Sequence, residues 1–123
     1  MNILLWVLQA LLAAVFLAHG WLLLAPPPDI AAQMVAALPR GFWVFLGVAE
    51  VLAAIGITLP GATRILPWLV PSAGAGIVFV MVSATIWHVV RGELSSAVIT
   101  LVLLAIASYV TYMRWRVAPI RAR

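Results

Sequence analysis

The second long apolar segment of the chain reads FWVFLGVAEVLAAIGITL from Phe42 to Leu59, and Glu50 is its single charged residue. A bilayer core of roughly 30 Å is crossed by a helix of about 20 apolar residues. This segment is long enough to cross, and Pro60-Gly61 after it is typical of a turn. The stretch therefore predicts a transmembrane helix that carries a carboxyl group inside the membrane.

Three further apolar segments surround it, at about 3–25, 65–90 and 94–113. Pro26-Pro27-Pro28 ends the first because proline lacks an amide donor, and Gly92 is a helix stop between the last two. The first segment is too long for a cleaved signal peptide and has no basic residues before it. We predict an all-α fold, a polytopic membrane four-helix bundle that forms one transmembrane domain over residues 1–123.

The segment 29–39 lies between the first and second spans and is too short to cross the membrane. Asp29 is expected to cap its first turn, and Met34 and Leu38 follow at helical spacing before Pro39 and Arg40 close it. We predict a short interfacial helix on the membrane surface.

Composition agrees with a membrane protein, since 67% of the residues are hydrophobic and 8% are charged, against about a quarter charged in soluble domains. The net charge of +4 comes from arginines beside apolar segments. Such arginines meet lipid head groups, so we expect no nucleic-acid partner. The absence of cysteine excludes thiol nucleophiles and iron–sulfur clusters. Redox chemistry would then need a bound cofactor or a redox-active substrate.

The arginines also predict the orientation, because cytoplasmic loops carry the excess of basic residues. With both termini inside, the inner set is Arg64, Arg114, Arg116, Arg121 and Arg123, and the outer set is only Arg40 and Arg91. Tryptophans favour the boundary between water and lipid. The same topology puts Trp6, Trp68 and Trp115 at the inner boundary and Trp21, Trp43 and Trp87 at the outer one. We predict a multi-pass protein of the bacterial inner membrane with N-in/C-in topology.

Glu50, His19 and His88 are candidate catalytic residues because the topology brings them from three helices to one layer in the outer half. A carboxyl group within a bilayer is costly and normally faces the bundle interior or a water-filled cavity, and imidazole titrates near neutral pH. The alternative for Glu50 is a hydrogen bond between helices that only fixes packing. For the histidines, it is an interfacial side chain that reaches water.

A ligand slot is predicted beside this layer, where Met81, Ala84 and His88 share one helix face. The same face could equally be a packing seam. Arg91 and Glu93 could pair with Glu50 or the histidines at the mouth of a pocket. The candidate ligand-binding residues are Trp43, Met81, Ala84, Trp87, Arg91 and Glu93.

Two histidines and one glutamate without local ligand spacing do not predict a metal site, and haem is a weaker possibility than an organic ligand. Gln9 is interpreted as an interhelical hydrogen bond. Small residues repeat every fourth position, and we expect these stripes to be helix contact faces. They are Ala10, Ala14 and Ala18, then Ala49 and Ala53, then Ser72 and Gly76.

The chain resembles the DoxX-like family of small four-helix membrane proteins over nearly its whole length. The residues that carry the resemblance are Gly20, Gly47-Val48-Ala49-Glu50, Leu59-Pro60 and His88-Val89-Val90-Arg91-Gly92-Glu93. One departure is that Leu22, Leu23 and Leu24 stand where the family often has a lysine after the first-helix glycine. The family takes its name from a subunit of a thiosulfate:quinone oxidoreductase. The resemblance implies a lipid quinone or another small apolar ligand, and a membrane or periplasmic oxidoreductase as partner.

Four functions follow as hypotheses, and we favour the first. It is a redox-linked membrane protein that binds a quinone or other small apolar ligand in an outer-half pocket. The second is a membrane isomerase or hydrolase that uses histidine and glutamate for acid–base chemistry. The others are a small proton-coupled exporter and a scaffold subunit that contacts a partner. A homo-oligomer is expected because four short helices bury little surface.

Overall fold

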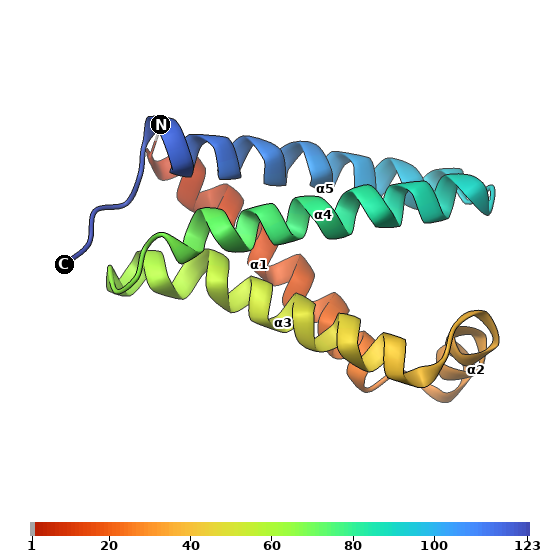
Figure 1. The fold of residues 1–123 in the computed structure, drawn as a ribbon. Helices are drawn as coiled ribbons and strands as arrows, with labels where there is room; N and C mark the ends of the chain where they lie inside the picture. Colours follow the sequence, from red (N-terminus) through yellow and green to blue (C-terminus); the bar gives the residue numbers. More distant parts are fainter. Residues whose placement is uncertain (1) are drawn as a thin grey trace.

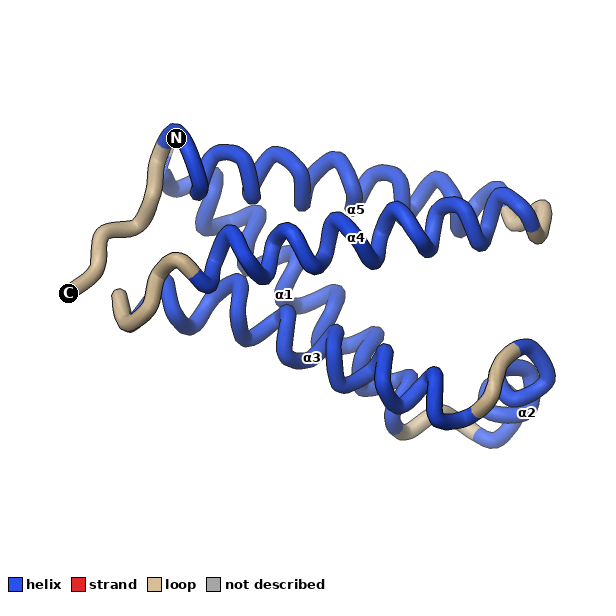
Figure 2. Tube along the Cα trace, in the orientation of Figure 1, coloured by secondary structure: helices blue, strands red, loops and turns tan. Residues whose placement is uncertain are grey.

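The structure is a computed structural model that describes residues 2–123, which fold into helices joined by short loops (Figure 1). The elements are α1 (Asn2–Leu24), α2 (Pro28–Ala37), α3 (Arg40–Thr63), α4 (Leu69–Val90), α5 (Leu94–Tyr112) and a π-helical turn (Met113–Val117). The part of the chain that the structure describes contains no β-strand (Figure 2). The all-α prediction is therefore confirmed.

Four of the helices are long and apolar enough to cross a membrane: α1, α3, α4, and α5 together with the π-turn (Leu94–Val117). Their mean hydropathies lie between 1.9 and 2.1. Large apolar side chains cover the outside, such as Phe79 on α4, which is 75% exposed. This is the surface expected of a bundle whose solvent is lipid, and it confirms four spanning helices. Both termini lie at the same end of the bundle (Figure 1), as an even number of crossings requires.

The four long helices are arranged as two pairs. α1 packs along α3 and α4 packs along α5, while α3 also contacts α4. The two pairs come together at the end that holds the termini and diverge toward α2 and the α4–α5 turn (Figure 1). The core between them is made of apolar side chains from all four long helices: Leu5, Leu12, Phe16, Ala54, Ile57, Val70, Ile77, Met81, Ala107 and Val110.

A tight helix contact joins α1 and α3 at two glycines. A Cβ atom placed on Gly20 would lie 2.9 Å from the Gly47 carbonyl oxygen and 3.2 Å from the Glu50 Cβ. Only residues without a side chain permit this approach, and small residues at membrane helix contacts serve this purpose. Gly20 packs against Val51 and Glu50 of α3, and it directly follows His19 in the chain. The same contact therefore positions the side chains of His19 and Glu50.

The prediction that Ala10, Ala14 and Ala18 form a helix contact face is wrong within one chain, because all three residues are exposed. The buried face of α1 is instead the stripe of Leu5, Gln9, Leu12, Phe16 and Gly20. Ser72 and Gly76 of α4 are exposed as well. On α3, by contrast, Ala53 packs against the core and Ala49 is half-buried. Small-residue spacing did not identify the buried faces of α1 and α4 because these helices are apolar on nearly every side.

The turn predicted at Pro60-Gly61 lies further along the chain, because α3 continues through Pro60 to Thr63. A proline near the end of a membrane helix removes one backbone donor, which neighbouring groups tolerate. α4 begins at Leu69 rather than Ile65, since Arg64 and Leu66 adopt positive φ angles of 60° and 50°. The residue before a proline disfavours the helical region, which ends any helix before Pro67.

The predicted interfacial segment is helical as α2, but Asp29 is not its N-cap. Pro27 occupies the N-cap position without a side-chain hydrogen bond, and Asp29 lies in the first turn. Arg40 instead caps the C-terminal end of α1. Its guanidinium donates to the Leu23 and Leu24 carbonyl oxygens at 2.7 and 2.6 Å, which satisfies the free carbonyls at the end of α1.

We expect Gly20→Ala to lower the stability of the bundle by roughly 1–3 kcal/mol, the cost of overpacking a tight contact. The matched control is Gly76→Ala, because a Cβ there meets no atom within 4 Å. Reversible unfolding in mixed micelles would measure both. Equal stabilities of the two variants would show that the α1–α3 contact is not tight.

Candidate functional site

The polar centre of the molecule is a hydrogen bond between His19 of α1 and Glu50 of α3. His19 Nδ1 lies 2.6 Å from Glu50 Oε2. The Glu50 side chain is 2% exposed, whereas the His19 side chain is 53% exposed. One proton lies between the two atoms: His19 donates it when the carboxyl is ionised and accepts it when the carboxyl is protonated. The pair can thus hold a proton at two sites.

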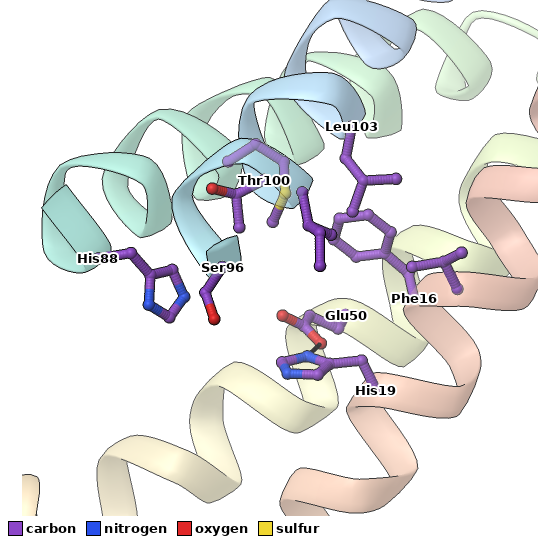
Figure 3. A pocket seen from close by; sticks show the side chains of 10 residues that line it. Phe16, His19, Glu50, His88, Ser96, Thr100 and Leu103 are labelled. Carbon is purple, nitrogen blue, oxygen red and sulfur yellow. Dashed lines mark hydrogen bonds and ion pairs between the residues drawn. The ribbon is translucent and has the colours of Figure 1, made fainter. Parts of the chain in front are cut away.

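A cavity of about 280 Å³ lies beside this pair, between the α1–α3 pair and the α4–α5 pair. Its lining combines His19 and Glu50 with apolar side chains and, on the opposite side, with His88 and two hydroxyl groups (Figure 3). The lining residues are Val15, Phe16, His19, Glu50, Met81, His88, Ser96, Ile99, Thr100 and Leu103. An apolar cavity with a few polar groups is the usual form of a small-molecule site.

The three predicted catalytic residues therefore all line one cavity. Figure 3 shows the His19–Glu50 pair on one side and His88 with Ser96 across from it. The second carboxylate oxygen, Glu50 Oε1, makes no hydrogen bond with any residue from 2 to 123. A ligand in the cavity could therefore hydrogen-bond to this oxygen or to the His19 ring.

The hydroxyls on the α5 side differ in their freedom to bind a ligand. Thr100 Oγ1 donates to the Ala97 carbonyl at 3.0 Å and accepts from Thr85 Oγ1 at 2.9 Å. Ser96 Oγ has no such partner among the described residues. Ser96 is therefore the hydroxyl that can hydrogen-bond to a bound molecule.

Of the six residues predicted to bind ligand, Met81 lines the cavity and the other five lie outside its lining. Trp43 Nε1 donates to the Met34 and Leu38 carbonyl oxygens at 2.8 and 3.1 Å, which ties α2 to α3. Ala84 packs against the core. The Arg91 guanidinium lies over the Trp87 ring, 5.1 Å from its centre.

The cavity residues that sequence reasoning missed follow helical spacing. Ser96, Ile99, Thr100 and Leu103 occupy one face of α5, and Val15 and Phe16 lie one turn before His19 on α1. Ser96 and Thr100 lie one turn apart, but α5 carries further hydroxyl residues such as Ser95, Ser108 and Thr111, so their spacing was a weak signal. Phe16 carried no signal, because α1 is apolar on every side.

Arg91 and Glu93 form a small ion-pair cluster with His88 in the turn between α4 and α5. Arg91 Nε donates to Glu93 Oε1 at 2.8 Å, and His88 Nδ1 lies 3.4 Å from the same oxygen. The predicted pairing of Glu93 with a histidine is therefore present. The predicted pairing of Arg91 or Glu93 with Glu50 is absent among the described residues. The hydrogen bond from Arg91 lowers the pKa of Glu93 below its ordinary value, and His88 adds to this effect.

We expect Arg91→Gln to raise the pKa of Glu93 toward its ordinary value. A lowered carboxyl pKa means that the pair stabilises the turn above the ordinary pKa and loses this effect as the pH falls through the folded-state value. Titration of the Glu93 carboxyl carbon by NMR would measure the change. Arg116→Gln, at the other end of the chain, is the control, and an equal midpoint in both variants would contradict the expectation.

No three histidine, aspartate or glutamate side chains within residues 2–123 gather closely enough to hold a metal ion. A family model described as the DoxX-like family matches residues 7–110 of the chain. The match covers the four spanning helices up to Val110 of α5, and it includes His19, Glu50 and His88. No curated protein and no solved structure was found to match the chain.

Proposed function

Since the chain belongs to the DoxX-like family, we propose that it binds a lipid quinone, or a small apolar molecule with a similar headgroup, between its two helix pairs. The observation that carries the proposal is the 2.6 Å contact between His19 and Glu50 in the lining of a cavity that combines apolar side chains with a few polar groups. With both termini in the cytoplasm, the cavity would lie in the periplasmic half of a bacterial inner membrane.

The shape and polarity of the lining support a ligand of this class. Phe16, Met81 and Leu103 offer apolar contacts for a ring or the start of an isoprenoid tail, and methionine adapts to ligands of irregular shape. His19 and Glu50 offer hydrogen bonds to a headgroup oxygen on one side, and Ser96 offers one across the cavity. Such a site would position the headgroup while leaving an apolar tail in contact with lipid.

The pair would exchange protons with the bound headgroup. Reduction of a quinone to a quinol consumes two electrons and two protons. His19 and Glu50 hold one proton between them, which the pair could pass to the headgroup. The pair could then take up a second proton through the half-exposed His19 ring and pass it on in the same way. The electrons would come from a partner oxidoreductase in or beside the membrane. In this proposal the chain binds the ligand and moves its protons, while the partner supplies the electrons.

The His19–Glu50 pair also supports a second candidate, an isomerase or hydrolase for a small apolar substrate. An imidazole that a carboxylate orients is a common general base. His88 lies on the opposite side of the cavity, where it would act as the general acid. This enzyme would turn over substrate without any electron donor, whereas the quinone-binding protein would not. Incubation of quinone and of apolar esters with purified protein alone would separate the two.

We expect wild-type protein to retain quinone after gentle purification and Glu50→Gln to retain at least tenfold less. A hydrogen bond to a charged group contributes about 1.5–3 kcal/mol, which corresponds to roughly a tenfold to hundredfold change in affinity. Mass spectrometry of extracted lipids would measure the ratio of quinone to protein. Asp29→Asn, which removes a carboxylate from the first turn of α2, is the matched control and should retain the wild-type amount.

Equal retention by Glu50→Gln and wild type would overturn the proposal. Thermal unfolding of Glu50→Gln distinguishes lost quinone binding from misfolding, because a misfolded variant would show no thermal transition. His19→Gln provides a second variant, since it keeps a hydrogen-bonding group at the half-exposed position but cannot carry a proton.

A further inference from the structure

One end of the bundle carries no acidic side chain. The three acidic residues lie on α2, on the middle of α3 and in the α4–α5 turn: Asp29, Glu50 and Glu93. The end that holds both termini carries five arginines and no carboxylate side chain, namely Arg64, Arg114, Arg116, Arg121 and Arg123. The arginines at this end therefore lack a side-chain counterion from the chain itself.

Arg114 is the buried member of this group, with 3% of its surface exposed. Its Nε donates to Gln9 Oε1 at 2.7 Å, and its Nη1 donates to Asn2 Oδ1 at 2.7 Å and to the Ala118 carbonyl at 3.1 Å. The Trp6 ring lies 5.2 Å from its guanidinium carbon. All these partners are neutral, and Nη2 is buried without any hydrogen-bond partner among the described residues.

A buried guanidinium with neutral partners and an Nη2 amino group without a hydrogen bond is costly, because the charge has left water without gaining an anion. The local backbone holds Arg114 in this buried position. Met113 and Arg114 are consecutive and both buried, and the π-turn closes with the Ala118 N–H donating to the Met113 carbonyl at 2.7 Å. Such wide turns occur often at functional sites.

Arg114 lines a cavity of about 580 Å³ at this end of the bundle. Arg64 and Arg121 line the same cavity, together with Asn2 and Trp6. The chain tail is held against it, since Arg64 Nε donates to the Arg121 carbonyl at 3.1 Å and the Arg123 N–H donates to the Arg64 carbonyl at 3.0 Å. Three arginines thus surround one cavity, one of them buried and two exposed.

We propose that this cavity binds an oxyanion of the phosphate type, with Arg114 as the buried anchor and Arg64 and Arg121 at its exposed side. Nε and Nη1 of Arg114 already donate to other groups, so Nη2 would donate to a phosphate oxygen in a charge-assisted hydrogen bond. The anion would also supply the missing counterion. The phosphate group could belong to an anionic phospholipid or to a soluble phosphate compound. This site is separate from the His19–Glu50 cavity, since the two share no lining residue.

The test uses the full chain in nanodiscs and measures the midpoint of thermal unfolding. One arm compares phosphatidylcholine alone with mixtures that contain phosphatidylglycerol. The other arm adds inorganic phosphate to nanodiscs of phosphatidylcholine. We expect one of these anions to raise the midpoint of the wild type and to bind Arg114→Gln at least tenfold more weakly. A response in the first arm identifies a lipid headgroup, and a response in the second identifies a soluble anion.

Arg116→Gln is the matched control, because it removes the same charge from an exposed arginine that stacks on Trp115 at 4.5 Å and does not line the cavity. It should respond like the wild type. If Arg114→Gln does not fold, the double variant Arg64→Gln with Arg121→Gln keeps the anchor and should bind the anion several-fold more weakly. The proposal is wrong if neither anion shifts the wild type, or if the cavity variants respond as Arg116→Gln does.

Discussion

A carboxyl group buried among apolar helices needs a polar partner from the protein, because lipid offers none. In this chain the partner of Glu50 is His19, on the neighbouring helix. The distance between them depends on Gly20 and Gly47, whose backbones meet without intervening side chains. Gly20 follows His19 directly, and Gly47 lies one turn before Glu50. The packing of α1 on α3 and the polar centre of the molecule are thus consequences of one contact.

The sequence predicted the four spanning helices and the gathering of Glu50, His19 and His88, because both depend on strong signals. Hydrocarbon thickness determines helix length, and an ionisable group in a span must face inward. The inward faces of the helices were harder to predict. A soluble helix shows its buried face as an apolar stripe, whereas these helices are apolar all round, so Ala10, Ala14 and Ala18 could not be distinguished from the true contact face.

The residues at the helix ends show a second limit of sequence reasoning. Trp43 and Arg40 were expected at the membrane boundary, and their partners are backbone carbonyl groups that the folded chain brings close. Arg40 satisfies the last carbonyls of α1, and Trp43 satisfies carbonyls of α2 and of the residue after it. Arg40 and Trp43 stabilise the connection between α1 and α3, so the Trp43 side chain does not line the cavity as predicted.

The hydrogen bonds of Arg114 join residues that are far apart in the chain, since Asn2 and Gln9 lie 112 and 105 positions before it. A ribosome releases the first helix long before the last, so Gln9 must wait for Arg114 while the intervening helices enter the bilayer. Gln9 also donates to the Ile57 carbonyl at 2.6 Å, so the first and third helices can associate early. The hydrogen bonds that join α1 to Arg114 can therefore form only after α5 has been synthesised.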